Sequence, residues 1–215
     1  MNKISNYILL AAFAIPFKAS EWQTLSYSSL PEHKLEFKTD SLHVGVKKSA
    51  MPLIYPLKAK PKVSSICLRG VKKGHINLED PKKQGQEGLD DFAIRLGLVE
   101  KGNETLNWFQ KKIAASWVLK LFSLAEKDEG INKIHFFTAA QDKSLVGNER
   151  EHPLGKGLML EKNIWHLDKS QKEFEFSYKL DKPIESLAIW LSIDGDDTKS
   201  SYEIDIKSLS LNCLD

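Results

Sequence analysis

The stretch Glu173-Phe174-Glu175-Phe176-Ser177-Tyr178-Lys179-Leu180 alternates polar and apolar side chains residue by residue. Alternation with a period of two places one set of side chains on each face of a β-strand, so this stretch predicts a half-buried strand. The same alternation recurs over residues 41–47, 91–98 and 186–193. Several strands joined by turn-rich loops predict an all-β, mostly antiparallel fold, arranged as a two-sheet jelly-roll β-sandwich.

Two features interrupt the alternation. The last strand changes phase after Ile206, which predicts a bulge near Lys207 and Ser208. Between residues 105 and 125 the apolar residues recur at helical spacing of three and four, which predicts one inserted amphipathic helix that packs against the sheets. The apolar residues of this segment are Leu106, Phe109, Ile113, Trp117, Leu121 and Leu124.

The N-terminal segment predicts export. Its apolar run carries no charge between Lys3 and Lys18, and it is shorter than the roughly 20 residues that span a bilayer. We therefore expect a signal peptide over residues 1–20 and a single domain over residues 21–215, located in the periplasm or secreted, with no membrane span after cleavage. The cleavage site stays open, although Ala12-Phe13-Ala14 is the best small-residue triplet; an uncleaved anchor is the alternative.

Charge and cysteine content limit the classes of partner. The chain has 31 basic and 29 acidic residues, and a leader that ends at residue 20 would remove two lysines and no acid. The mature chain is thus close to neutral, which gives no reason to expect nucleic acid as a partner. Cys67 and Cys213 are the two cysteines. In an oxidising compartment they can form a disulfide, and two separate buried thiols are the alternative.

An acidic turn, Asp194-Gly195-Asp196-Asp197-Thr198, is the most distinctive polar cluster. Carboxylate oxygens are the ligands that calcium prefers, so Asp194, Asp196 and Asp197 are candidate calcium ligands, and no other cofactor is expected. The turn is not an EF-hand, because Lys199 stands where that loop needs glycine. Asp-Gly is also common in ordinary turns, and since calcium takes 6 to 8 oxygens we favour the turn interpretation.

A second cluster lies in the predicted strand that follows residue 89. Asp91 and Arg95 would share one of its faces and could contact a polyol, or Arg95 could pair with Asp91 or with another acid. Trp190 projects from a non-core face, where it could stack on a sugar ring or pack under the predicted helix. Together with Asp196, these three residues are the candidate ligand-binding residues. The segment 149–152 and the pair His166 and Asp168 are interpreted as surface.

These two motifs resemble those of a bacterial family of exported proteins, the domain of unknown function 3047 family. Residues 90–95 match its acidic pair followed by an aromatic residue, alanine and arginine. Residues 194–198 match its Asp-x-Asp-Asn-Thr, with Asp197 in place of the asparagine, and Asp205-Ile206 matches its last strand, although Ile204 stands where glycine is expected. The resemblance implies export and a sandwich like those of carbohydrate-binding modules, without implying a substrate.

Three hypotheses for function follow. The first is a non-catalytic binding module for a carbohydrate or another polar component of the cell envelope. The second is a glycoside-acting hydrolase with Asp91 and Asp196 as an acid–base pair. The third is a structural or assembly partner. No catalytic residue is assigned, because the chain contains no Gly-x-Ser-x-Gly, His-Glu-x-x-His, phosphate-binding glycine loop or Cys-x-x-Cys motif.

Overall fold

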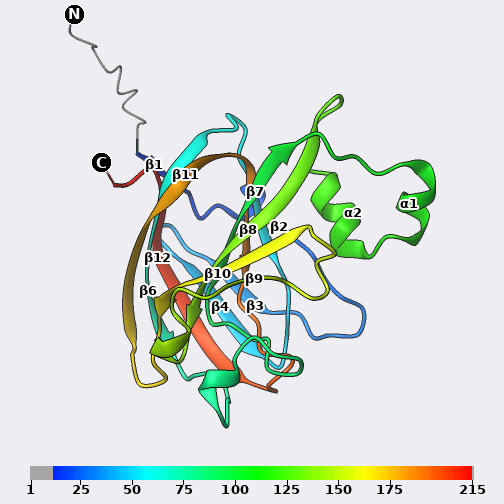
Figure 1. Cartoon of the computed structure of the whole chain (residues 1–215). Helices are drawn as coiled ribbons and strands as arrows, with labels where there is room; N and C mark the ends of the chain where they lie inside the picture. Colours follow the sequence, from blue (N-terminus) through cyan, green and yellow to red (C-terminus); the bar gives the residue numbers. More distant parts are fainter. Residues whose placement is uncertain (1–11, 215) are drawn as a thin grey trace, which may run out of the picture.

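The computed structural model describes residues 12–214, which form two packed β-sheets with two short helices at one side (Figure 1). The prediction of a mostly antiparallel two-sheet β-sandwich is therefore confirmed. Among the described strands, one pair, β8 and β10, runs parallel.

The first sheet has the strand order β3-β4-β12-β6-β11, and the short β1 also pairs with β12. Its strands are β1 (Phe13–Ala14), β3 (Lys34–Phe37), β4 (Leu42–Lys47), β6 (Lys62–Lys73), β11 (Glu173–Ser192) and β12 (Ser201–Leu211). The second sheet runs β2-β5-β11-β7-β8-β10-β9. Its other strands are β2 (Gln23–Thr24), β5 (Leu53–Pro56), β7 (Arg95–Gly102), β8 (Gly130–Ala140), β9 (Glu149–Glu151) and β10 (Met159–His166).

Strand β11 belongs to both sheets. Its first part, residues 173–185, pairs with β6, and its last part, residues 186–192, pairs with β7 and β5. The register against β6 shifts between Lys179 and Ile184, and such irregularities bend and twist a strand. The bend carries the chain from one layer of the sandwich to the other, as the orange ribbon in Figure 1 shows.

The main core lies between the two sheets. Alternate residues of β11, including Phe174, Phe176 and Ile189, are buried there. A second apolar cluster forms around Trp190, Phe136 and the helical residue Leu121. Residues 187–193 are therefore buried on both faces, which corrects the expectation that only one face of this strand lies in the core.

The helical segment differs from the prediction of one continuous helix. Two helices form instead, α1 (Trp108–Ile113) and α2 (Ser116–Phe122), because Ala114 and Ala115 adopt extended backbone between them. Asn107 caps the start of α1 by accepting a hydrogen bond from the backbone N–H of Gln110, in a reciprocal capping box. Only α2 packs on a sheet; α1 has no buried residue. Among the described residues, no helix is long and apolar enough to cross a membrane.

Two further expectations concern a bulge within one strand and the start of another. The predicted bulge is confirmed, because the register of β12 against β6 shifts between Ile206 and Ser208. The predicted strand over residues 91–98 starts only at Arg95. Three short 3-10 helices occupy the connections: η1 (Ala19–Glu21), η2 (Pro81–Lys83) and η3 (Lys143–Leu145).

The apolar run that predicts a signal peptide lies partly outside the described residues. Its last part is ordered in the fold: Phe13 and Ala14 pair with β12, and Ile15 and Phe17 are buried in the main core. A cut after residue 20 would remove both of these buried side chains.

Cys67 of β6 and Cys213, just beyond β12, form a disulfide. The bond settles the alternative that the sequence left open, in favour of pairing. It ties together two positions that are 146 residues apart in the chain. A cross-link over so long a loop removes much of the conformational entropy of the unfolded chain.

Replacing both cysteines, Cys67→Ser with Cys213→Ser, should lower the free energy of unfolding by about 2–5 kcal/mol. Urea denaturation followed by circular dichroism measures the change. Reduction of the wild-type protein should produce the same loss, while the reductant should leave the double variant unaffected. An unchanged denaturation midpoint would contradict the stabilising role of the bond.

Candidate functional site

A cavity of about 350 Å³ lies where α2, the acidic turn and the start of β7 meet. Its wall contains every residue singled out from the sequence as a binding or metal candidate: Asp91, Arg95, Trp190, Asp194, Asp196 and Asp197. The two polar motifs are about a hundred residues apart in the chain and lie at one place in the fold. The structure thus brings all six candidates together.

Asp91 joins the two motifs. It is fully buried, and its carboxylate accepts hydrogen bonds from the backbone N–H groups of Asp197 (3.4 Å) and Thr198 (2.7 Å) and from the Thr198 hydroxyl. In the other direction, the backbone N–H of Asp90 donates to the Asp197 carboxylate at 3.3 Å. Asp91 therefore holds the acidic turn in place and does not form the ion pair with Arg95 that was one expectation.

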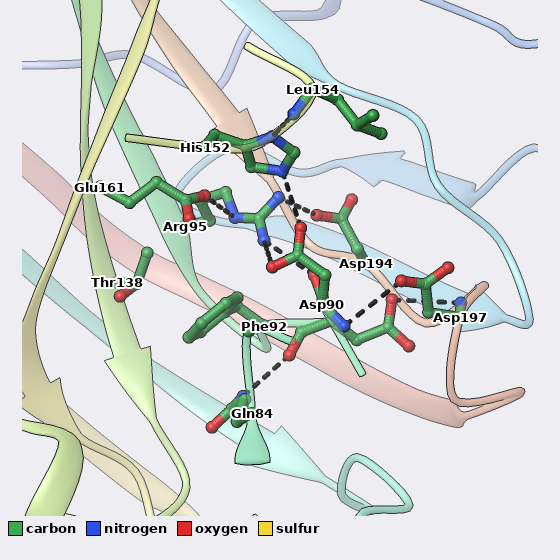
Figure 2. A network of polar contacts seen from close by, with 12 residues as sticks. Gln84, Asp90, Phe92, Arg95, Thr138, His152, Leu154, Glu161, Asp194 and Asp197 are labelled. Carbon is green, nitrogen blue, oxygen red and sulfur yellow. Dashed lines mark hydrogen bonds and ion pairs between the residues drawn. The ribbon is translucent and has the colours of Figure 1, made fainter. Parts of the chain in front are cut away.

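Arg95 is the buried cation at the centre of the site (Figure 2). Its Nη2 donates to the carbonyl oxygen of Asp90 at 2.8 Å and lies 3.1 Å from that residue's carboxylate. Its Nε lies 3.3 Å from Glu161 and its Nη1 3.4 Å from Asp194. Burial alone would lower the pKa of Arg95, but these carboxylates raise it, so the guanidinium stays charged. The group also lies 4.9 Å from the centre of the Phe92 ring.

Arg150 and His152 complete the network, although the sequence had placed residues 149–152 on the surface. Arg150 of β9 stands opposite Glu161 of β10, and its Nη2 lies 2.6 Å from both Glu161 and Asp90. The nitrogen Nδ1 of His152 accepts the backbone N–H of Leu154 at 3.1 Å. Its Nε2 therefore carries the proton and donates to Asp90 at 2.7 Å.

A weak signal for these two residues was present in the sequence. Arg150 and His152 are two positions apart, which is the spacing that puts side chains on one face of a strand. Nothing in the sequence showed that the short strand β9 pairs with β10. That pairing brings Arg150 to the buried side chain of Glu161.

The donor atoms of Asp90, His152 and Glu161 all lie within 4.8 Å of one another, and this is the one metal-like set of three among the described residues. The guanidinium of Arg150 already lies between Asp90 and Glu161, where it supplies the positive charge that a metal ion would supply. Asp194, Asp196 and Asp197 form no such set. Asp197 is engaged by Asp90, and Asp194 faces Arg95.

Burial and neighbouring charges together give the carboxyl groups of Asp90, Asp194 and Asp196 different pKa values. It raises the pKa of Asp194 to about 8, with nearby carboxylates adding to the effect and Arg95 opposing it. Burial and the charge of Asp91 raise the pKa of Asp196 to about 6. Burial also acts to raise the pKa of Asp90, but Arg95, His152 and Arg150 outweigh it and the value is lowered. At neutral pH the cavity therefore offers a protonated carboxyl group, Asp194, beside an ionised one.

The lining of the cavity also contains apolar side chains. Trp190 is only 2% exposed and packs beneath α2, which is one of the two alternatives that the sequence left open. Trp117 of α2 is half-buried and presents more ring surface. Met159 and the exposed Leu154 add to this apolar lining. A ligand in the cavity would thus meet both carboxyl groups and aromatic and aliphatic side chains.

Comparison with known proteins gives similarity of structure only. No family model and no curated protein matches the chain. The family 11 carbohydrate-binding module from Clostridium thermocellum, solved with a β-1,3-1,4-mixed-linked tetrasaccharide, is 11% identical, with a TM-score of 0.44 and coverage of 93% of this chain and 94% of that chain. The xylan-binding module CBM15 is 10% identical, with a TM-score of 0.37 and coverage of 94% and 95%.

A third similar structure belongs to a longer chain. The glycoside hydrolase domain of Endo-D from Streptococcus pneumoniae is 9% identical, with a TM-score of 0.31, and the match covers 88% of this chain and 21% of that chain. All these identities and scores are low, so the roles of the site residues rest on the geometry of this chain.

The raised pKa of Asp194 has a consequence for stability. Between the ordinary carboxyl pKa and about 8, the folded chain holds a proton at Asp194 that the unfolded chain releases, so this contribution to stability falls as pH rises. Buried His33, whose pKa burial lowers to about 4, contributes in the opposite direction only below its ordinary value near 6.5. In the window from pH 6.5 to 8 most of the slope therefore comes from Asp194, with a smaller part from Asp196, whose pKa is raised to about 6.

In that window Asp194→Asn should gain stability relative to the wild type by about 1–2 kcal/mol as pH rises, because the slope is up to about 1.4 kcal/mol per pH unit. Urea denaturation at successive pH values measures the difference. The exposed Asp40→Asn is the matched control and should follow the wild-type curve. Parallel curves for Asp194→Asn and the wild type would show that Asp194 does not hold a proton.

Proposed function

We propose that this protein is a non-catalytic β-sandwich binding module whose cavity takes a carbohydrate or a similar polyhydroxylated component of the cell envelope. The observation that carries the proposal is the mixed lining of the cavity, which combines carboxyl groups with aromatic and aliphatic side chains. Sites for small polar ligands commonly combine a largely apolar lining with a few convergent polar groups.

The chemistry of the wall suits a sugar. The hydroxyl groups of a sugar donate and accept hydrogen bonds, and the cavity offers Asp196, ionised above its pKa of about 6, as an acceptor and protonated Asp194 as a donor. The C–H faces of a sugar ring are apolar, and Trp117 and Met159 provide a surface on which they can pack.

The burial and hydrogen bonding of Asp91 favour a binding function over hydrolysis. A general acid or base must reach the reacting atoms, but this carboxylate is buried and already accepts hydrogen bonds from Thr198 and Asp197. Asp196 lines the same cavity, and without a free second carboxylate at Asp91 the acid–base pair of the hydrolase hypothesis is incomplete.

Soluble neutral and amino-sugar oligosaccharides should raise the melting temperature of the mature domain, with at least one bound measurably in calorimetry. Asp196→Asn and Trp117→Ala should each weaken that binding by about tenfold or more. The first removes a charged hydrogen-bond acceptor, and the second removes the ring on which a sugar can pack. Asp40→Asn, away from the cavity, should bind as the wild type does. A melting temperature that no oligosaccharide moves would overturn the proposal.

The same screen addresses the two alternatives. Calcium that stabilises the wild type but not the Asp194→Asn, Asp196→Asn variant would support the calcium hypothesis for the acidic turn. Appearance of shorter saccharides on incubation, lost in Asp196→Asn, would replace the binding module by a hydrolase.

We also propose export to the periplasm or beyond, supported by the disulfide, since such bonds persist in oxidising compartments. The packing favours a cut after Ala14, because the mature chain then keeps Ile15 and Phe17 in the core. Mass spectrometry of the exported protein should give Ile15 as its first residue. A mature chain that starts at Ser20 or Glu21, or one that keeps the leader, would contradict this cleavage site.

A further inference from the structure

Helix α1 exposes several large apolar side chains. Trp108 is 71% exposed, Phe109 62% and Ile113 69%, and Leu119 of α2 is also exposed. None of them is buried, whereas most large apolar residues of the described chain are. Apolar side chains gathered at one exposed place mark a surface that binds something.

The same segment is positively charged. Lys111, Lys112 and Lys120 lie in it, and the sequence has no acidic residue between Glu104 and Glu126. Glu126 does not neutralise these lysines, because it pairs with Lys60 at 3.0 Å. The Nζ of Lys112 lies 3.7 Å from the centre of the Trp108 ring, so cation and aromatic ring are presented together.

The arrangement of the two helices projects this surface away from the body. Leu121 anchors α2 in the cluster beneath it, while α1 extends beyond α2 (Figure 1). The break at Ala114 and Ala115 separates the anchored helix from the projecting one. The exposed apolar residues thus lie on the outside of the domain, beyond the anchored helix.

We propose that α1 and the beginning of α2 form a docking surface for an anionic lipid bilayer. Trp108, Phe109 and Ile113 enter the boundary between headgroups and acyl chains, and the lysines contact the anionic headgroups. Exposed aromatic and aliphatic residues with lysines beside them are a composition that favours the interface of an anionic membrane. This docking surface is distinct from the proposed carbohydrate-binding function of the cavity, and the inference goes beyond that function.

Charge argues for lipid over a second copy of the chain. Two copies that met through this surface would bring Lys111, Lys112 and Lys120 against the same lysines of the other copy, which is unfavourable. An anionic bilayer is complementary to both features. Because Trp117 belongs both to α2 and to the cavity wall, the docked domain holds its cavity close to the membrane.

The test is co-sedimentation of the whole chain with vesicles of phosphatidylcholine alone and of phosphatidylcholine mixed with phosphatidylglycerol. The wild type should bind the mixed vesicles much more strongly, and added salt should weaken the binding. Lys111→Glu with Lys112→Glu should reduce the affinity at least about 20-fold. The matched control, Lys47→Glu with Lys48→Glu, changes two other exposed neighbouring lysines and should bind as the wild type does.

Insertion is measured separately. Trp108→Ala with Phe109→Ala should abolish vesicle binding while leaving the melting temperature unchanged, because both side chains are exposed. Trp108→Phe should still bind but lose the blue shift of tryptophan fluorescence that vesicles produce in the wild type.

Three results would overturn the proposal. The first is wild-type protein that does not sediment with the mixed vesicles. The second is equal loss of binding in the Lys47, Lys48 control, which would make the attraction a general charge effect. The third is a dimer in solution that the Trp108, Phe109 variant converts to monomer, which would assign the surface to a second copy.

Discussion

One buried positive charge organises the functional end of this protein. The guanidinium of Arg95 is surrounded by the carboxylates of Asp90 and Glu161 and by the protonated carboxyl group of Asp194, which come from three separate parts of the chain. Removing ions from water is costly, and the cost is offset only while the opposite charges stay close. The start of β7, the middle of β10 and the end of β11 are therefore held at fixed distances, and the cavity takes its shape from that constraint.

Most of the architecture could be predicted from the sequence, and the reasons are local. Apolar residues at alternate positions, such as Phe174, Phe176 and Leu180, predict a strand with one buried face. The change of phase after Ile206 predicts the bulge. The six candidate residues met at one cavity because both polar motifs stand where strands begin or end. Their individual roles were less predictable: Asp91 braces a turn, and Trp190 packs beneath a helix.

What could not be predicted depended on pairing between distant segments. Arg150 and His152 became part of the site only because β9 lies beside β10, and a three-residue strand carries too little pattern to show its neighbour. The helical segment forms two helices where the sequence predicts one, for a related reason. Spacing of three and four residues continues across Ala114 and Ala115, but it cannot show that the backbone there becomes extended. That α1 does not pack on the sheet depends on tertiary structure, which the local spacing of apolar residues does not show.

The passage of β11 through both sheets also bears on how the domain comes apart. In a sandwich whose layers share no strand, one sheet can loosen while the other stays intact. Here a single strand of 20 residues supplies backbone partners to β6 in one layer and to β7 in the other. Loss of either layer strips hydrogen bonds from the same strand, so the two layers melt as one cooperative unit.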